Sequence, residues 1–166
     1  MAQNSVSYLA YGSNLHPERI AQRVGEPLAA EAVSLAGWSI RFHKRSRDGS
    51  GKCDIIPASG QFVHGVIYTL TRRAKQRLDL IEGAGFGYSC VELAAPGVGT
   101  VATYRAVTHV IDGTLKPYSW YHQLVVEGAR HHGLPADYVA SLAAVATVDD
   151  PDQTRHRRES RILISD

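Results

Sequence analysis

The sequence predicts an α+β fold in which a mainly antiparallel sheet comes first and a pair of helices follows. Two observations favour this class. Short β-rich runs bounded by glycine or proline fill the first two thirds of the chain, whereas residues 119–145 carry apolar side chains at helical spacing. Because strands and helices occupy separate parts of the chain, a doubly wound parallel sheet is disfavoured, and we expect a small, barrel-like sheet with flanking helices.

The first elements are a buried strand, a polar loop and a short helix. Residues 6–11 are apolar and aromatic and stop at a glycine, as expected of a strand in the core. A proline at the first position and a glycine after the last predict a helix over Pro17–Val24. Residues 12–14 therefore link a strand to a helix.

The middle of the chain predicts further strands around a basic loop. Trp38, Ile40 and Phe42 alternate with polar residues, which is the period of a half-buried strand, and residues 62–70 form another β-rich run. Between them, residues 44–52 are basic and rich in glycine and serine. This composition indicates a mobile turn.

The remaining elements are a capped helix, a strand pair and two helices. Thr71 is suited to cap a helix that ends at Gly83. The β-rich runs 88–95 and 100–108 are separated by proline and glycine, which predicts paired strands. A helix over residues 119–132 follows, and Pro135 opens the last one.

Length and composition fit one compact domain. The chain has 166 residues, of which 44% are hydrophobic and 20% charged, so it can bury a core and is unlike a disordered segment. We predict a single domain over residues 1–150. A polar, arginine-rich tail at 151–166 is expected to drape over that domain or to fray.

Charge and cysteine content narrow the classes of partner. With 18 basic and 16 acidic residues the formal net charge is +2, too balanced to indicate nucleic acid as a partner. Residues 1–11 lack the features of a secretory signal, and no stretch reaches membrane-spanning length. Cys53 and Cys90 form no CxxC pattern and fit reduced thiols, which predicts a cytoplasmic location.

The loop at Tyr11, Gly12, Ser13, Asn14 and Leu15 is the first candidate site. A strand-to-helix loop of this kind presents free backbone N–H groups at a helix N-terminus, which suits a carboxylate or a developing oxyanion. The alternative, favoured on these residues alone, is that Ser13 and Asn14 cap the helix. The glycine that a nucleophile elbow needs after its serine is absent, so acyl-serine chemistry is disfavoured.

Glu82 is the second candidate, because it lies in the last turn of the helix predicted after Thr71. The negative end of the helix dipole and burial beside Ile81 would both favour the protonated carboxyl, as a general acid/base requires. The alternative is an ordinary surface glutamate at a frayed helix end. The glycines at 83–87 do not indicate a dinucleotide loop, since they close a helix instead of following a strand.

Two weaker signals concern charge and metals. The cations of the basic loop would steer an anionic substrate, or simply form a solvated turn, which is favoured: Arg41, Lys44, Arg45, Arg47 and Lys52. The eight histidines and two cysteines show no paired ligand spacing, so neither a metal nor a cofactor is predicted.

These segments resemble the γ-glutamylcyclotransferase-like family. The family's opening motif, Tyr-Gly-Ser-Asn-Leu, matches residues 11–15, and its glutamate motif, Leu-Asp-x-x-Glu-Gly followed by a tyrosine, matches residues 78–83 and Tyr88. Further similar segments follow in the family's order: 42–46 and 48–52, which look like the bacterial branch, 65–68, and 133–135 before Tyr138. The match therefore runs over nearly the whole chain.

The resemblance implies a small mixed α/β barrel with a pocket where the loop faces Glu82. Glu82 would be the catalytic acid/base, and the substrate would be bound by Tyr11, Gly12, Ser13, Asn14, Leu15 and Tyr88. The implied reaction converts a γ-glutamyl amide, either a γ-glutamyl amino acid or a γ-glutamylamine, to 5-oxoproline and a free amine without a cofactor. Asn14 stands where glutathione-specific relatives look to carry an apolar residue, which argues against glutathione.

Two other classes of function are weighed against this enzyme. A non-catalytic module of the same fold would bind a γ-glutamyl or acidic metabolite, but would be expected to have lost the carboxylate that Glu82 supplies. A nucleic-acid binder would use residues 41–52 and 155–161, yet the chain contains no recognisable nucleic-acid module. The sequence leaves open which amine is released and whether a homodimer forms.

Overall fold

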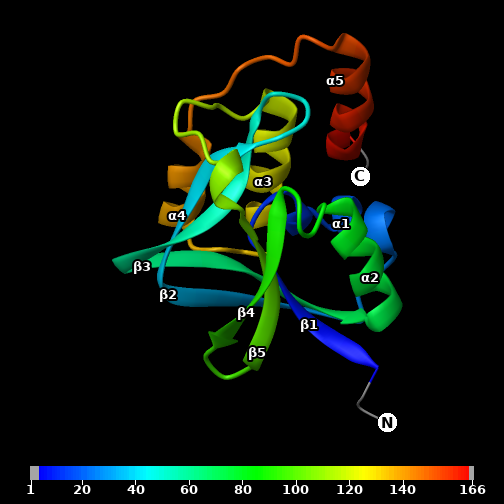
Figure 1. Cartoon of the computed structure of the whole chain (residues 1–166), viewed down its shortest axis with the longest axis vertical. Coiled ribbons are helices and arrows are strands. Elements are labelled where there is room, and N and C mark those ends of the chain that lie inside the picture. The colour runs from blue at the N-terminus through cyan, green and yellow to red at the C-terminus, as the bar shows by residue number, and fades with distance from the viewer. Residues whose placement is uncertain (1–3, 165–166) are drawn as a thin grey trace.

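The fold is built on one five-stranded sheet with helices packed around it (Figure 1). The computed structural model describes residues 4–164. The strands, in sheet order, are β2 (Ala29–Arg45), β3 (Gly51–Thr71), β1 (Ser5–Ala10), β5 (Gly99–Ala106) and β4 (Tyr88–Ala95). Neighbouring strands run antiparallel except for β1 and β5, which are parallel. The predicted α+β class is confirmed.

The sheet is open and does not close into the expected barrel. Its edge strands, β2 and β4, are not paired with each other in the described part of the chain. The long β2–β3 hairpin instead carries two register shifts, between Ala36 and Trp38 and between Arg41 and Lys44. Such irregularities bend a hairpin and raise its twist.

The helices lie in three groups around the sheet: α1 (Pro17–Val24) with α2 (Arg72–Ile81), α3 (Ser119–His131) with α4 (Ala136–Ala143), and α5 (Gln153–Ser160) beside α3 (Figure 1). The helix predicted over Pro17–Val24 is confirmed at both ends, with proline in its first turn and Gly25 at φ 88° after its last residue. The predicted cap of α2 is also confirmed, since the Thr71 side chain accepts a hydrogen bond from Ala74 N.

The basic segment 44–52 is more ordered than the mobile turn that we expected. Lys44 pairs with Lys52 and Arg45 with Gly51 across the hairpin, which leaves a turn of residues 46–50. Within that turn the Asp48 side chain accepts hydrogen bonds from the backbone N–H and the hydroxyl of Ser50, and Ser50 itself is buried. Local side-chain bonds of this kind fix a turn that its composition alone describes as loose.

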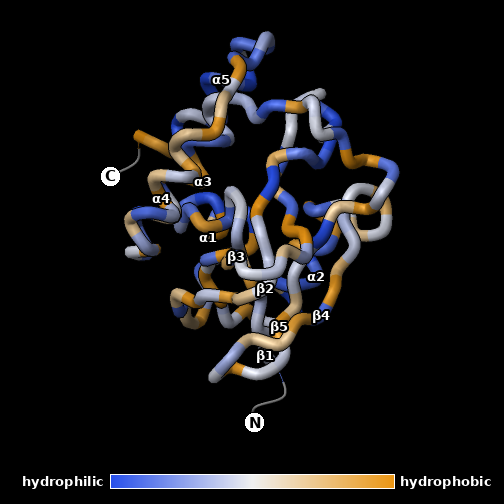
Figure 2. Tube along the Cα trace, turned by 90° about the vertical axis from the view of Figure 1, so that its left-hand side faces the viewer, coloured by the Kyte–Doolittle hydropathy of each residue, from blue (hydrophilic) through white to orange (hydrophobic). Residues whose placement is uncertain are grey.

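The polar segment after residue 150 forms α5 instead of draping or fraying. Asp152 caps the helix by accepting from Arg155 N, and Arg155 forms an ion pair with the buried Asp150. Asp150 also accepts from Trp120 Nε1, which ties the segment to α3, and Ile162, which follows α5 in the chain, is buried. Figure 2 shows the largely hydrophilic colouring of α5, which explains why composition predicts a tail.

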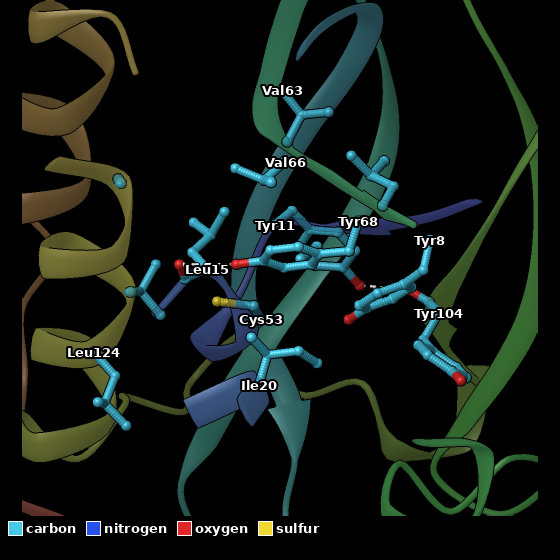
Figure 3. Packing of buried hydrophobic residues seen from close by; sticks show 14 of the residues in the cluster. Tyr8, Tyr11, Leu15, Ile20, Cys53, Val63, Val66, Tyr68, Tyr104 and Leu124 are labelled. Atoms are coloured by element: carbon cyan, nitrogen blue, oxygen red, sulfur yellow. Dashed lines mark hydrogen bonds between the residues drawn. The ribbon is translucent and has the colours of Figure 1, made fainter. Parts of the chain in front are cut away.

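The core packs the sheet against α3 and brings the 12–15 loop into the same layer. Leu15, Ile20, Tyr68 and Leu124 are almost fully buried and lie together (Figure 3). At Gly128 of α3 a Cβ atom would lie only 2.5 Å from His16 N and from the carbonyl carbon of Leu15. The loop backbone therefore rests directly on the helix.

Candidate active site

A cavity of about 150 Å³ opens between the 12–14 loop, α1, the end of α2, the β2–β3 hairpin and α3. Six of the seven candidate site residues line it: Glu82, Tyr11, Gly12, Ser13, Asn14 and Tyr88. Leu15 does not. It is fully buried in the core, and its N–H donates to Gly12 O at 3.0 Å, so it cannot contact a ligand in the cavity.

Glu82 is held by one of its two carboxylate oxygens. It follows the last residue of α2, and its Oε1 accepts from Asn14 Nδ2 and from Arg23 Nη1, both at 3.1 Å. Arg23 Nη1 also donates to Asn14 Oδ1 at 3.1 Å, which closes the triangle. Within residues 4–164 no hydrogen bond uses Glu82 Oε2. The carboxylate is thus oriented, with one oxygen unengaged.

The 12–14 loop does not cap a helix. The Asn14 amide bonds Glu82 and Tyr8 instead, and neither the turn at Ser13–Leu15 nor α1 has a side-chain cap. The N–H groups of Gly12, Ser13 and Asn14 have no acceptor among the described residues. These donors belong to a 3₁₀ turn that precedes α1, and not, as expected, to the head of α1 itself.

The two candidate tyrosines contribute their rings to the cavity, whereas their hydroxyls are engaged elsewhere. Tyr88 OH donates to Cys53 O at 2.7 Å, and Tyr11 OH donates to Tyr104 O. Burial raises the pKa of both phenols well above the usual value, so they are neutral donors. Their positions fit walls of the site better than proton carriers.

The cavity is also lined by four cationic side chains that were not predicted to lie there: Arg19, Arg23, Lys44 and Lys52. The last two belong to the basic loop, for which a solvated turn was favoured, whereas Arg41, Arg45 and Arg47 are exposed as expected. A spacing of four residues on α1 puts Arg19 and Arg23 on one face, but helical spacing alone does not indicate what that face contacts. The carboxylate of Glu82 lines the same cavity as these four cations.

Of the two lysines that line the cavity, Lys52 is more enclosed than Lys44. Its Nζ lies 3.1 Å from Asp48 Oδ2 and 4.4 Å and 4.3 Å from the ring centroids of Trp120 and Tyr121. Burial lowers the pKa of Lys52 to about 8, an effect that Asp48 opposes. Its ammonium is consequently close to its titration range near neutral pH.

The described residues show neither a cluster of metal-binding side chains nor a membrane-spanning helix. Residues 4–164 contain no group of three or more His, Cys, Asp or Glu side chains that could hold a metal ion. None of the helices in the same range is long and apolar enough to cross a bilayer.

Known proteins are similar to this chain in sequence and in fold. A family model described as AIG2-like matches residues 62–142. Human gamma-glutamylcyclotransferase is 28% identical over 154 residues, covering 89% of this chain and 82% of the human protein, and the bovine protein of that name is 27% identical over 152 residues, covering 87% and 81%. A solved structure named gamma-glutamyl cyclotransferase aligns with a TM-score of 0.84 at 26% identity, over 97% of this chain and 99% of that chain.

The fold and the sequence are therefore those of an enzyme of the γ-glutamylcyclotransferase type. These likenesses, which extend over nearly the whole chain, confirm the resemblance to the γ-glutamylcyclotransferase-like family that the sequence motifs indicate.

Proposed function

We propose that the protein converts a γ-glutamyl amide to 5-oxoproline and a free amine, with Glu82 as the acid/base. The observation that carries this proposal is the Glu82 carboxylate at the cavity wall, held through Oε1 and unengaged at Oε2. A base needs a fixed orientation and a free lone pair, and this arrangement supplies both. Either a γ-glutamyl amino acid or a γ-glutamylamine satisfies the chemistry.

The reaction is an intramolecular aminolysis. Glu82 accepts a proton from the α-ammonium of the substrate, and the neutral amine attacks the γ-carbonyl carbon. The new C–N bond closes the five-membered ring, and the old C–N bond to the amine part breaks as the departing nitrogen takes back the proton held by Glu82. The ring nitrogen then gives up its second proton, which Glu82 passes in the same way to the departing amine, so that this amine leaves as an ammonium ion. Because nucleophile and leaving group belong to one molecule, the step needs no cofactor.

The 12–14 loop supplies the electrostatic part of the mechanism. Gly12, Ser13 and Asn14 line the cavity, and their backbone N–H groups have no acceptor among the described residues. They would bind either the carbonyl oxygen as it gains charge or the α-carboxylate of the glutamyl part. Folding the substrate so that its amine lies about 3 Å from the carbonyl is worth several kcal/mol by proximity.

A panel of substrates tests the proposal. Purified protein is incubated with γ-glutamyl amino acids, γ-glutamylamines and glutathione, and 5-oxoproline is quantified by mass spectrometry. We expect release from at least one of the first two groups and little from glutathione. Release from none of them would contradict the proposal and favour a non-catalytic metabolite-binding module. A cytoplasmic site of action, without nucleic-acid or membrane partners, is part of the proposal and rests on charge balance and cysteine content.

A further inference from the structure

We propose that Lys52 and Arg19 form an anion subsite on the α3 side of the cavity, and that it binds a carboxylate carried by the amine part of the substrate. The inference rests on the proposed function and makes it more specific. It identifies Lys52 as a specificity-determining residue that favours γ-glutamyl amino acids over γ-glutamylamines.

The first argument is the unfilled bonding capacity of Lys52. An ammonium group has three N–H donors, and Asp48 is the single carboxylate within ion-pair distance of Nζ in the described chain. The rings of Trp120 and Tyr121 attract the charge through their faces but accept no strong hydrogen bond. A buried cation with unfilled donors is costly, so an anion entering the cavity gains more here than at a solvated lysine.

The second argument is the neighbouring arginine. Arg19 Nη1 donates to Glu159 Oε2 at 2.5 Å, but its buried Nε has no hydrogen-bond partner in the described chain. Its guanidinium lies 5.9 Å from the Trp120 ring centroid, on the same indole that Lys52 contacts. Repulsion from Arg19 and Arg23 adds to the effect of burial in lowering the pKa of Lys52. A carboxylate between Lys52 and Arg19 would relieve this repulsion and fill both sets of donors.

The third argument is the division of the cavity. Glu82 and the 12–14 loop lie next to one another, joined through Asn14, and serve the glutamyl half of the substrate in the proposed reaction. Lys52 packs instead on Trp120 and Tyr121, which belong to α3. A substrate with its glutamyl half at Glu82 directs its amine part toward the remaining wall. An amino acid in that part brings a carboxylate, whereas a simple amine brings none.

The test compares two substrates that differ in this carboxylate alone, γ-glutamylalanine and γ-glutamylethylamine. For the native enzyme we expect kcat/KM to be higher for γ-glutamylalanine by roughly tenfold or more, the effect of one or two charge-assisted hydrogen bonds. Lys52→Met keeps the stem of the side chain on the rings and should bring this preference close to one. Lys52→Arg keeps the charge and should retain much of it.

Two further variants guard against trivial outcomes. Arg19→Gln removes the second cation and should lower the same preference, which gives an independent test if Lys52→Met does not fold. Lys75→Met is the matched control, because Lys75 is a buried lysine that lies outside the cavity and pairs with Asp79. It should leave the preference unchanged.

The possible failures are distinguishable. Equal kcat/KM for the two substrates, or an equal loss for both in Lys52→Met, would overturn the subsite while 5-oxoproline release still supports the proposed function. Release from neither substrate would defeat the proposed function itself. Calorimetry then decides on the subsite, since it requires tighter binding of γ-glutamylalanine than of γ-glutamylethylamine, lost in Lys52→Met, and equal binding would overturn it.

Discussion

The two sides of the cavity handle charge differently. On the α2 side, a closed triangle of hydrogen bonds joins Glu82, Asn14 and Arg23 and orients the carboxylate, whose Oε2 is unengaged among the described residues. On the α3 side, the Nζ atom of Lys52 and the Nε atom of Arg19 are buried and have N–H donors that no described residue accepts from. A closed hydrogen-bond network is preorganised for catalysis in the absence of substrate, whereas N–H donors without an acceptor are available to bind a negatively charged group of the ligand. The contrast separates residues that act on the reacting atoms from residues that select the substrate.

The largest expected effect comes from removing the base on the α2 side. Glu82→Gln keeps an acceptor for Asn14 and Arg23 but cannot take a proton, so kcat for 5-oxoproline release should fall by roughly two to four orders of magnitude. The melting temperature should change by only a few degrees, because the lost ion pair is partly exposed.

The matched control is the other carboxylate of the helix. Asp79 lies outside the cavity, where it pairs with Lys75 and accepts from Tyr104 OH at 2.6 Å. Asp79→Asn should therefore retain turnover. If Asp79→Asn abolished turnover while Glu82→Gln spared it, the assignment of the base would be wrong.

A smaller loss should follow when the triangle is opened without removing the base. Arg23→Met takes away one of the two bonds to Glu82 Oε1 and the bond to Asn14 Oδ1. The freed carboxylate samples unproductive orientations, so kcat should fall by roughly ten- to a hundredfold with a smaller change in KM. Arg77→Met, at an exposed position of α2, is the control. A change confined to KM would instead indicate that Arg23 binds substrate directly.

The α3 side should respond to pH. Burial lowers the pKa of Lys52 to about 8, with Asp48 opposing the decrease and Arg19 and Arg23 adding to it. Below pH 8 the ammonium is charged and holds the carboxylate, and above it the amine is neutral and the contact weakens. The ratio of kcat/KM for γ-glutamylalanine over γ-glutamylethylamine should therefore decline, by up to about tenfold, as pH rises from 7 to 9.

Taking the ratio removes the titration of groups that both substrates share. Lys52→Arg should abolish the decline, since a guanidinium stays charged over this range. A ratio that is flat in the native enzyme, or that still declines in Lys52→Arg, would assign the pH dependence to another group.

The smallest effect is expected where the two sides meet at the loop. A Cβ atom on Gly12 would lie 3.1 Å from Cys53 Cβ and 3.2 Å from Tyr121 OH, slightly closer than ordinary contact. Gly12→Ala should cost about 1 kcal/mol and raise KM by roughly fivefold. Steady-state kinetics and a thermal melt measure the two quantities. An unchanged KM would show that substrate does not approach this part of the loop.

Sequence patterns predicted those parts of the fold that local chemistry decides. Proline and glycine give the bounds of α1, and Thr71 gives the start of α2. The first part of β2, residues 29–36, was missed because small and exposed side chains obscure its alternation. The helix α5 was missed because ion pairs of Asp150 and Asp152, which no hydropathy pattern reveals, hold it.

Only part of the site, the loop and Glu82, could be predicted from the sequence, for a similar reason. Short motifs located the loop and Glu82, which are joined by the hydrogen bond from Asn14 Nδ2 of the loop to Glu82 Oε1. The cations were missed because periodicity shows that a face is polar without showing what it meets. Lys52 in particular lies in a polar segment that indicates a solvated turn, yet pairing across the hairpin turns it inward onto α3.

The contact between Gly128 and the loop sets a tolerance for the whole site. Gly128 does not line the cavity, but even one methyl group there would meet His16 N and the Leu15 carbonyl carbon at 2.5 Å. Relief would require the loop to retreat by about 1 Å, a displacement that at reacting groups can cost roughly a hundredfold in rate. In a mutational scan this helix glycine would therefore score with the active-site positions, and a design that replaces it to raise helix propensity would lose the loop geometry.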